Sequence, residues 1–164
     1  MKPNIRIGYG YDVHALAKGV DFWIGGIKVP HTYGAYGHSD ADVLIHAICD
    51  ALLGAANSRD IGYHFSDKDP AYKGIDSKIL LKDVMGKIRE RGYQVGNIDA
   101  TVCLEMPKLN PHIPAMKACL ARVMEIDEED ISIKATTTEK LGFVGEEKGV
   151  AAHTVALIYK EEAL

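Results

Sequence analysis

The spacing of hydrophobic residues along the chain predicts short strands and amphipathic helices. Runs rich in β-branched and aromatic side chains, bounded by turn-forming residues, are typical of strands. One such run is interrupted by Gly25-Gly26, which predicts a bent hairpin at that point. The segments that predict strands are 5–13, 22–29, 98–104, 131–136 and 150–159.

Three other segments repeat apolar residues every three to four positions, which is the spacing of one helix face. The first helix is expected to follow an N-cap at Ser39 and to end near Gly54. The second covers 77–91, and the third covers 111–124 with proline at its first position. The side chains expected to face the core are Leu44, Ala47, Ile48, Ala51 and Leu52 in the first helix and Ile79, Leu80, Val84 and Ile88 in the second.

The order of these elements, β-β-α-α-β-α-β-β, indicates an α+β fold. We expect a two-layer sandwich in which a mixed four-stranded sheet carries helices on one face, with a small β-hairpin beside it. Segment 58–73 is polar and without periodicity, so we expect a functional loop there. Residues 1–164 contain no repeat or low-complexity tract and are expected to form a single domain.

Composition narrows the function classes. The chain is 47% hydrophobic and 26% charged with a formal net charge of −4, so it lacks the basic excess typical of nucleic-acid binding. No apolar run reaches membrane-spanning length, and the patterned sequence begins too early for a signal peptide. Cys49, Cys103 and Cys119 are odd in number, widely spaced and set among apolar residues, which predicts reduced thiols and a cytoplasmic protein.

Two histidines and an aspartate have the chemistry of a metal site. Asp12 and His14 stand two positions apart on a predicted strand and so share one face. His46 lies on the first predicted helix, on one stripe with Asp42 and Asp50. Either the stripe is a solvated charge cluster, or His46 is a ligand and the two carboxylates orient ligand imidazoles. Two histidines and one carboxylate leave a coordination position open, as in catalytic zinc sites, although Mn²⁺ and Fe²⁺ suit the same ligands.

Two further segments suit phosphate groups. His38 and Ser39 precede the first predicted helix, whose N-terminus favours an anion unless Ser39 is an ordinary cap. Segment 134–139 ends a strand with three threonines and Glu139, a composition that also follows from simple β-propensity. Together the hydroxyls and the carboxylate could hold a diphosphate and a second, hard divalent cation.

Four motifs resemble one enzyme family over nearly the whole chain. They are RIGYGYDVH at 6–14, HSDADVLIH at 38–46, DIG at 60–62 and KATTTEKLGF at 134–143. On these motifs the chain resembles the 2-C-methyl-D-erythritol 2,4-cyclodiphosphate synthases, enzymes of the non-mevalonate isoprenoid pathway. The resemblance implies a homotrimer with active sites between adjacent subunits. It also suggests an isoprenoid diphosphate as a ligand of a cavity within the trimer.

The resemblance also implies roles for individual residues. Zn²⁺ would be held by Asp12, His14 and His46, and a second divalent cation, Mg²⁺ or Mn²⁺, would lie near Glu139. His38 and Thr137 would assist the transition state. The residues expected to contact the substrate are Asp12, His14, His38, Ser39, Asp60, Ile61, Gly62, Phe65, Ser66, Asp67, Lys68, Asp69, Leu104, Glu105, Met106, Pro107, Lys108, Leu109, Asn110, Thr136, Thr137, Thr138, Glu139 and Phe143.

The implied reaction is an intramolecular phosphoryl transfer. The 2-phosphate of 4-diphosphocytidyl-2-C-methyl-D-erythritol 2-phosphate would attack the β-phosphorus of its own diphosphate, close an eight-membered ring and expel CMP. Two other functions fit the same residues: a zinc-dependent phosphoesterase, and a non-catalytic module with a structural metal. The chain departs from the family at Glu146, where an arginine is usual, with Lys148 nearby, and at Asn110, where an apolar residue is usual.

Overall fold

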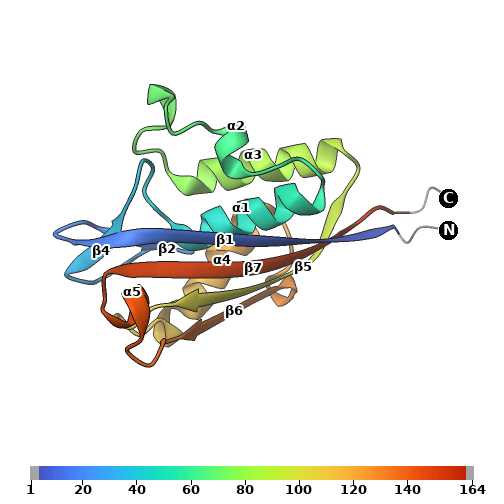
Figure 1. The fold of residues 1–164 in the computed structure, drawn as a ribbon. Helices are drawn as coiled ribbons and strands as arrows, with labels where there is room; N and C mark the ends of the chain where they lie inside the picture. Colours follow the sequence, from blue (N-terminus) through green and yellow to red (C-terminus); the bar gives the residue numbers. More distant parts are fainter. Residues whose placement is uncertain (1–3, 162–164) are drawn as a thin grey trace.

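A mixed sheet of five strands carries the helices on one face in the computed structural model, which describes residues 4–161 (Figure 1). The strand order is β4-β1-β7-β5-β6, and every neighbouring pair is antiparallel except the parallel pair β5-β6. A separate two-stranded hairpin stands beside this sheet. The strands are β1 (Ile5–Lys18), β2 (Phe22–Ile24), β3 (Ile27–Val29), β4 (Tyr33–Tyr36), β5 (Gln94–Cys103), β6 (Ile131–Thr136) and β7 (Gly149–Tyr159).

The expected fold class is confirmed, but the expectation of four strands in the main sheet is wrong. The additional strand is β4, which pairs with the end of β1 from Ala15↔Tyr36 to Lys18↔Tyr33. Four residues are too few to show periodicity, and their partner is an extension of β1 beyond the predicted end at residue 13. The hairpin was expected, and Gly25 and Gly26 form its turn at positive φ, a conformation that glycine adopts without steric cost.

The helices are α1 (Val43–Ala55), α2 (Ile61–His64), α3 (Ser77–Glu90), α4 (Ile113–Met124) and α5 (Gly142–Gly145). Three single 3-10 turns add η1 (Pro70–Tyr72), η2 (Asn110–His112) and η3 (Glu128–Asp130). The expected loop 58–73 therefore contains two short helical turns, α2 and η1. Within the described residues no helix is long and apolar enough to cross a membrane.

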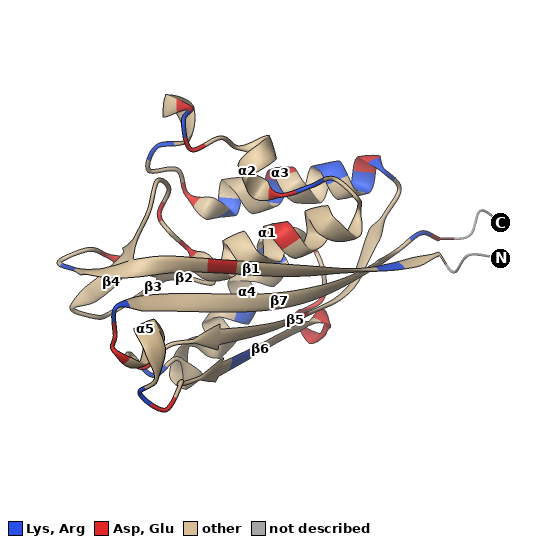
Figure 2. Cartoon of the chain, in the orientation of Figure 1, with Lys and Arg blue, Asp and Glu red and all other residues tan. Residues whose placement is uncertain are grey.

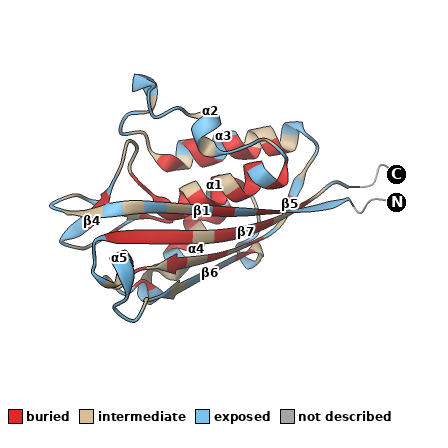
Figure 3. Ribbon diagram, in the orientation of Figure 1, coloured by how far each residue is buried: buried red, intermediate tan, exposed pale blue. Residues whose placement is uncertain are grey.

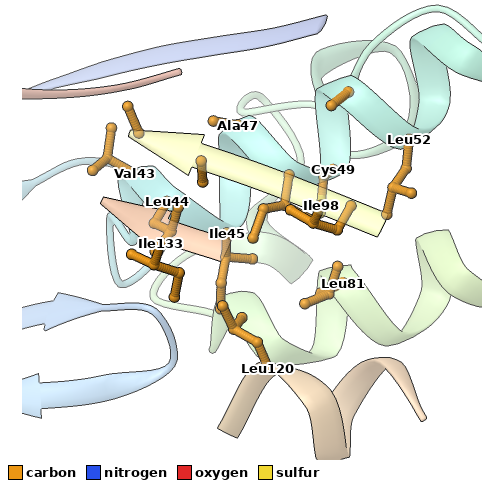
Figure 4. Close-up of a cluster of buried hydrophobic side chains, with 14 of the residues drawn as sticks. Val43, Leu44, Ile45, Ala47, Cys49, Leu52, Leu81, Ile98, Leu120 and Ile133 are labelled. Atoms are coloured by element: carbon orange, nitrogen blue, oxygen red, sulfur yellow. The ribbon is translucent and has the colours of Figure 1, made fainter. Parts of the chain in front are cut away.

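Helix α1 is the centre of the core (Figures 3 and 4). Its predicted core residues are all buried, and so are most of the others, because the sheet lies on one side of α1 and α3 on another. The residues of α1 that retain exposure follow one helical stripe, His46, Asp50 and Gly54. In α3 the expectation for Ile79 is wrong: this side chain is 58% exposed, and Leu81 and Met85 are buried in its place.

Asp42, rather than Ser39, is the N-cap of α1. Its carboxylate accepts hydrogen bonds from the backbone N–H groups of Ile45 (3.0 Å), Gly25 (3.0 Å) and Gly26 (2.7 Å). The side chain is completely buried, and burial raises the pKa of Asp42 in spite of these hydrogen bonds. The Asp42 carboxylate therefore joins the hairpin turn to the first turn of α1 and accepts no hydrogen bond from the His46 imidazole.

Strand β1 and helix α1 pack so closely that the backbone of α1 occupies the space that a side chain at Gly8 or Gly10 would need. A Cβ atom at Gly8 would lie 1.9 Å from the carbonyl oxygen of Ala51, and one at Gly10 would lie 1.9 Å from that of Ala47. Neither position can carry a side chain unless the helix moves. The two glycines therefore set the distance between the strand that holds Asp12 and His14 and the helix that holds His46.

Candidate metal centre and substrate site

Asp12, His14 and His46 converge between β1 and α1. Even-numbered residues of β1 face α1, so the two-residue spacing points Asp12 and His14 toward the helix, as expected. Asp12 Oδ2 lies 3.0 Å from His14 Nε2 and 3.0 Å from His46 Nδ1, and the two histidine nitrogens are 3.1 Å apart. Ligand atoms of a tetrahedral zinc ion, with bonds of about 2.0–2.1 Å, stand about 3.3 Å apart. The triangle is therefore close to the size that a metal ion requires, and its imidazole and carboxylate donors fit one.

The charges of the triad favour a bound cation. Burial would raise the pKa of Asp12, but hydrogen bonds and charge interactions with His14 and His46 lower it far below its usual range. Burial would likewise lower the pKa of His46, but the hydrogen bond and charge of Asp12 outweigh burial and raise it. Asp12 thus stays ionised and stabilises positive charge beside it. A metal cation can supply that charge in place of a proton on His46.

The second nitrogen of His46 faces two hydroxyl groups. His46 Nε2 lies 2.9 Å from Ser77 Oγ and 3.1 Å from Ser39 Oγ, and Ser77 in turn donates to Asp40. The carboxylates expected to orient imidazoles, Asp42 and Asp50, have other partners, because Asp50 accepts a hydrogen bond from the backbone N–H of Ile61 (2.7 Å). The sequence pattern offered no sign of Ser77, because it lies 31 positions after His46.

A cavity of about 430 Å³ opens beside the triad. It brings together many of the residues expected at the methylerythritol phosphate end of the substrate, and it adds three that were not expected: Tyr72, Ile75 and Leu80. These three are apolar or aromatic side chains outside the recognised motifs, so no motif indicated them. The expected residues on its wall are Asp12, His14, His38, Ser39, His46, Ile61, Gly62, Phe65 and Asp67.

Side chains of the 58–73 loop order its backbone. Asp60 caps α2 by accepting from the N–H of Tyr63 (2.9 Å), and Asp69 accepts from that of Ala71 (2.9 Å). Ser66 Oγ accepts from the N–H of Lys68 (3.2 Å). Asp60, Ser66, Lys68 and Asp69 are thus present in the loop that borders the cavity, but they are not among its lining residues.

The position of Ser39 corrects the expectation of an anion site at a helix N-terminus. Helix α1 begins four residues after Ser39, and its N-cap is Asp42, which accepts from the N–H of Ile45. Ser39 Oγ instead accepts from the N–H of Ala41 (3.1 Å), a residue held at a φ of 58°. This turn directs the Ser39 hydroxyl toward His46 and the cavity.

A second, smaller cavity of about 180 Å³ lies at the far edge of the sheet. Residues from both segments expected at the cytidine diphosphate end line it, namely Leu104, Lys108, Leu109, Asn110, Ala135, Thr136 and Thr137. The neighbouring turn is held by Glu105, whose Oε1 accepts from the N–H groups of Thr138 (3.1 Å) and Lys140 (3.3 Å). Of the other expected residues, Glu139 follows in this turn at a φ of 52°, and Phe143 is 45% exposed on α5.

The two cavities do not meet within one chain. The metal triad is on β1 and α1, whereas Thr136 ends β6, and β7 and β5 lie between these strands. Three strand spacings separate β1 from β6, which is about 14 Å. The structure therefore brings expected site residues together as two groups, one beside β1 and α1 and one beside the end of β6. Figure 1 shows β7 and β5 between β1 and β6.

Comparison with known proteins gives a consistent match over the whole fold. A sequence profile of the YgbB family matches residues 5–159. The chain is 68% identical over 157 residues to the 2-C-methyl-D-erythritol 2,4-cyclodiphosphate synthase of Parabacteroides distasonis, covering 96% of this chain and 98% of that one. It is 63% identical over 158 residues to the enzyme of the same name from Porphyromonas gingivalis, covering 96% of this chain and 98% of that one.

Solved structures of similar fold support the same family. The bifunctional IspDF of Campylobacter jejuni has a TM-score of 0.92 at 39% identity, over 96% of this chain and 42% of that one. The CDP complex of Plasmodium falciparum IspF has a TM-score of 0.86 at 32% identity, over 99% and 100% of the two chains. The chain therefore belongs to the YgbB family, together with the 2-C-methyl-D-erythritol 2,4-cyclodiphosphate synthases to which it is similar.

Proposed function

We propose that this chain converts 4-diphosphocytidyl-2-C-methyl-D-erythritol 2-phosphate to 2-C-methyl-D-erythritol 2,4-cyclodiphosphate and CMP, a step of isoprenoid precursor synthesis. The observation that carries the proposal is the Asp12–His14–His46 triangle on the wall of the larger cavity. Relatives that cover almost the whole chain carry the name of this synthase, which supports the same activity here.

The reaction needs no protein nucleophile. An oxygen of the 2-phosphate forms a new bond to the β-phosphorus, and the bond from that phosphorus to the bridging oxygen breaks. The electron pair leaves with CMP, and the product keeps both phosphates in one ring. The chain's task is to hold two mutually repelling phosphates in line, and such orientation can contribute about 7–11 kcal/mol in favourable intramolecular cases.

Zinc is the proposed metal of the triad. Two imidazoles and one carboxylate with an open position are the donor set of catalytic zinc, and Asp12, His14 and His46 would hold it. When bound, zinc neutralises phosphate charge and makes the β-phosphorus more electrophilic. His38 and Ser39 border the same cavity, where they would contact the 2-phosphate end and limit its movement.

The smaller cavity is the proposed cytidine diphosphate subsite. Thr136 and Thr137 supply hydroxyl donors at its edge, and the carboxylate of Glu139 follows them. We assign Thr137, with His38, to the transition state, and Glu139 to a second divalent cation, Mg²⁺ or Mn²⁺, which prefers oxygen ligands. A solved relative carries CDP, which supports a cytidine diphosphate ligand for this chain.

A homotrimer would unite the two cavities between neighbouring subunits. The support is the uncovered face of β1 and β7, where apolar side chains are exposed in a continuous strip: Ile5 51%, Ile7 69%, Tyr9 61%, Tyr11 44%, Val13 41% and Val155 43%. Few charged residues interrupt these two strands (Figure 2). An apolar surface of this kind marks a protein interface.

A charge in this strip is expected to separate the subunits. Ile7→Lys should turn a trimer into a monomer and abolish turnover, because a lysine buried in an apolar interface lacks a partner. Light scattering after gel filtration measures the mass. Ile79→Lys is the matched control, because Ile79 is similarly exposed at 58% but lies on α3, away from the sheet. A wild-type monomer with full activity would contradict the trimer.

Two finer points extend the proposal. An isoprenoid diphosphate as the ligand of a trimer cavity is proposed from family resemblance. Near the position where the family usually carries arginine, Lys148 forms an exposed ion pair with Glu146. Exposed pairs of this kind are weak, so this contact does not prevent Lys148 from binding an anion. A cytoplasmic location is consistent with free thiols at Cys49, Cys103 and Cys119.

Phosphorus NMR of the substrate with enzyme, Zn²⁺ and Mg²⁺ tests the proposed function. We expect the resonances of the phosphomonoester and the linear diphosphate to be replaced by those of a cyclic diphosphate and CMP. Release of inorganic phosphate or of a linear phosphorylated alcohol would instead show a zinc phosphoesterase. The absence of any change with metal bound would point to a binding module.

A further inference from the structure

The imidazole of His46 is held from both sides. Its Nδ1 faces Asp12 and His14 at 3.0 and 3.1 Å, on the side where a metal fits. Its Nε2 faces away, toward the hydroxyls of Ser77 and Ser39. A histidine that binds a metal through one ring nitrogen keeps its proton on the other. His46 Nε2 must therefore donate a hydrogen bond to one of the two serines.

Ser77 is the better acceptor of the two. It is completely buried, its Oγ is 2.9 Å from His46 Nε2, and the same hydroxyl donates to Asp40 Oδ1 at 2.5 Å. A hydroxyl that donates to a carboxylate becomes a stronger acceptor, because hydrogen bonds in a chain polarise one another. Ser39 lies farther from His46 at 3.1 Å and borders the cavity, where its hydroxyl remains available to a ligand.

Asp40 is fixed so that its charge acts through Ser77. Asp40 Oδ2 accepts from the backbone N–H of Ser77 (3.0 Å), and Oδ1 accepts from that of Asp42 (3.2 Å). The backbone N–H of Asp40 donates to the carbonyl of Ile75 (3.0 Å), which ties the turn before α1 to the start of α3. Among residues 4–161, no lysine or arginine forms an ion pair with Asp40.

The Ser77 hydroxyl is not required for helix capping. Asp76 is the N-cap of α3 and accepts from the N–H of Lys78 at 2.9 Å. The hydroxyl of Ser77 donates to the carboxylate of Asp40, which lies 37 positions earlier in the chain, and helix capping does not require such a contact. The buried hydroxyl is therefore available to accept a hydrogen bond from His46 while it donates to Asp40.

We propose that Asp40 and Ser77 are positioning residues that hold the His46 ring with its proton on Nε2 and its Nδ1 lone pair directed at the metal. They touch neither substrate nor metal, and they act through His46. The proposal rests on the proposed function only in taking Asp12, His14 and His46 as the metal ligands. In other proteins a carboxylate orients a zinc-bound histidine directly. Here the hydroxyl of Ser77 lies between the carboxylate of Asp40 and the imidazole of His46.

Zinc affinity and the His46 tautomer test this proposal. Metal-free wild type, Ser77→Ala, Asp40→Asn and the double variant are titrated with Zn²⁺ against a competing chelator. We expect each single variant to bind zinc about 10- to 100-fold more weakly, the range found for such orienting groups. The double variant should be no weaker than Ser77→Ala, because the two residues act in series. Ser132→Ala, an exposed serine on β6, is the control and should bind as wild type.

Long-range proton–nitrogen NMR of the His46 ring in the zinc-bound protein supplies a measurement that simple destabilisation would not change. In the zinc-bound wild type we expect the only ring N–H proton to be on Nε2, shifted downfield and protected from solvent exchange by its hydrogen bond to Ser77. In Ser77→Ala and Asp40→Asn we expect that shift and protection to decrease. A zinc-bound wild type with the proton on Nδ1, or wild-type zinc affinity in both single variants, would overturn the proposal. Thermal unfolding shows whether each variant is folded. If Ser77→Ala does not fold, the zinc affinity and the His46 proton signal of Asp40→Asn test the proposal.

The result is separable from the proposed function. If the wild type binds zinc but makes no cyclic product, the proposed reaction fails. The positioning role of Asp40 and Ser77 is then still tested by zinc affinity and by the position of the His46 ring proton. If the wild type makes the cyclic product and the variants bind zinc with wild-type affinity, the positioning role of Asp40 and Ser77 is wrong and the proposed reaction stands.

Discussion

His46→Ala is expected to remove zinc from the Asp12–His14 pair and to lower turnover by at least about 10³-fold. The reason is that a catalytic metal contributes several kcal/mol of charge stabilisation, and about 1.4 kcal/mol corresponds to each factor of ten. Two ligands that remain on β1 offer no tetrahedral set. Zinc analysis of the dialysed protein and the rate of CMP release measure the two losses.

The fold should survive this change. The His46 side chain is 12% exposed and lies on the one partly exposed stripe of α1, and the apolar residues around the rest of the helix are unchanged. Circular dichroism should therefore show a cooperative transition for His46→Ala. The matched control is His31→Ala, a histidine that packs against Tyr33 near β4, and it should keep wild-type zinc content. Undiminished zinc in His46→Ala would remove the basis for the metal centre.

Gly10→Ala is expected to have the largest effect on stability. The added Cβ would lie 1.9 Å from the carbonyl oxygen of Ala47 and 2.7 Å from the N–H nitrogen of Ala51, so rotation of a side chain cannot relieve the clash. Helix α1 must move away from β1, at a cost of about 3 kcal/mol or more, the upper end for overpacked cores. Chemical denaturation measures the loss in the free energy of unfolding.

The same movement should affect the metal centre. It separates His46 on α1 from Asp12 and His14 on β1, and a displacement of about 1 Å can cost about 10²-fold in rate. Gly86→Ala is the matched control, because Gly86 lies within α3 with no atom near its added Cβ. That change should stabilise the protein by about 0.5–1 kcal/mol, since alanine is the better helix former. If Gly10→Ala were as stable as wild type with unchanged zinc affinity, the close packing of β1 and α1 would not set the site.

Local patterns in the sequence predicted much of this fold. Strand β7, helix α1 and the hairpin at Gly25-Gly26 each have periodicity or turn residues within one short segment. Strand β4 did not, because its four residues become a strand only by pairing with the end of β1. Ile79 was assigned to the core from helical spacing alone, but the directions of α1 and α4 decide which face of α3 is buried.

The candidate site could likewise be predicted only in part from the sequence. Asp12 and His14 could be paired from strand geometry. The helix pattern left His46 open between a charge cluster and a ligand, and family motifs made it the third ligand and suggested the residues proposed to contact phosphate. Orientation of His46 through Ser77 and Asp40 could not be predicted, because it depends on the contact between the turn before α1 and the start of α3. Asp42 shared a stripe with His46 in the sequence pattern, but the structure uses its carboxylate to cap the helix.

The central claim is that Asp12, His14 and His46 hold the metal at which the diphosphate reacts. A crystal structure with Zn²⁺, Mg²⁺ and CDP, with diffraction recorded on both sides of the zinc absorption edge, tests it most directly. We expect an anomalous peak bonded to Asp12, His14 and His46, with an oxygen of the β-phosphate as its further ligand and cytidine in the cavity lined by Leu104 and Thr136. Zinc at another position, or a diphosphate remote from the triad, would contradict the account.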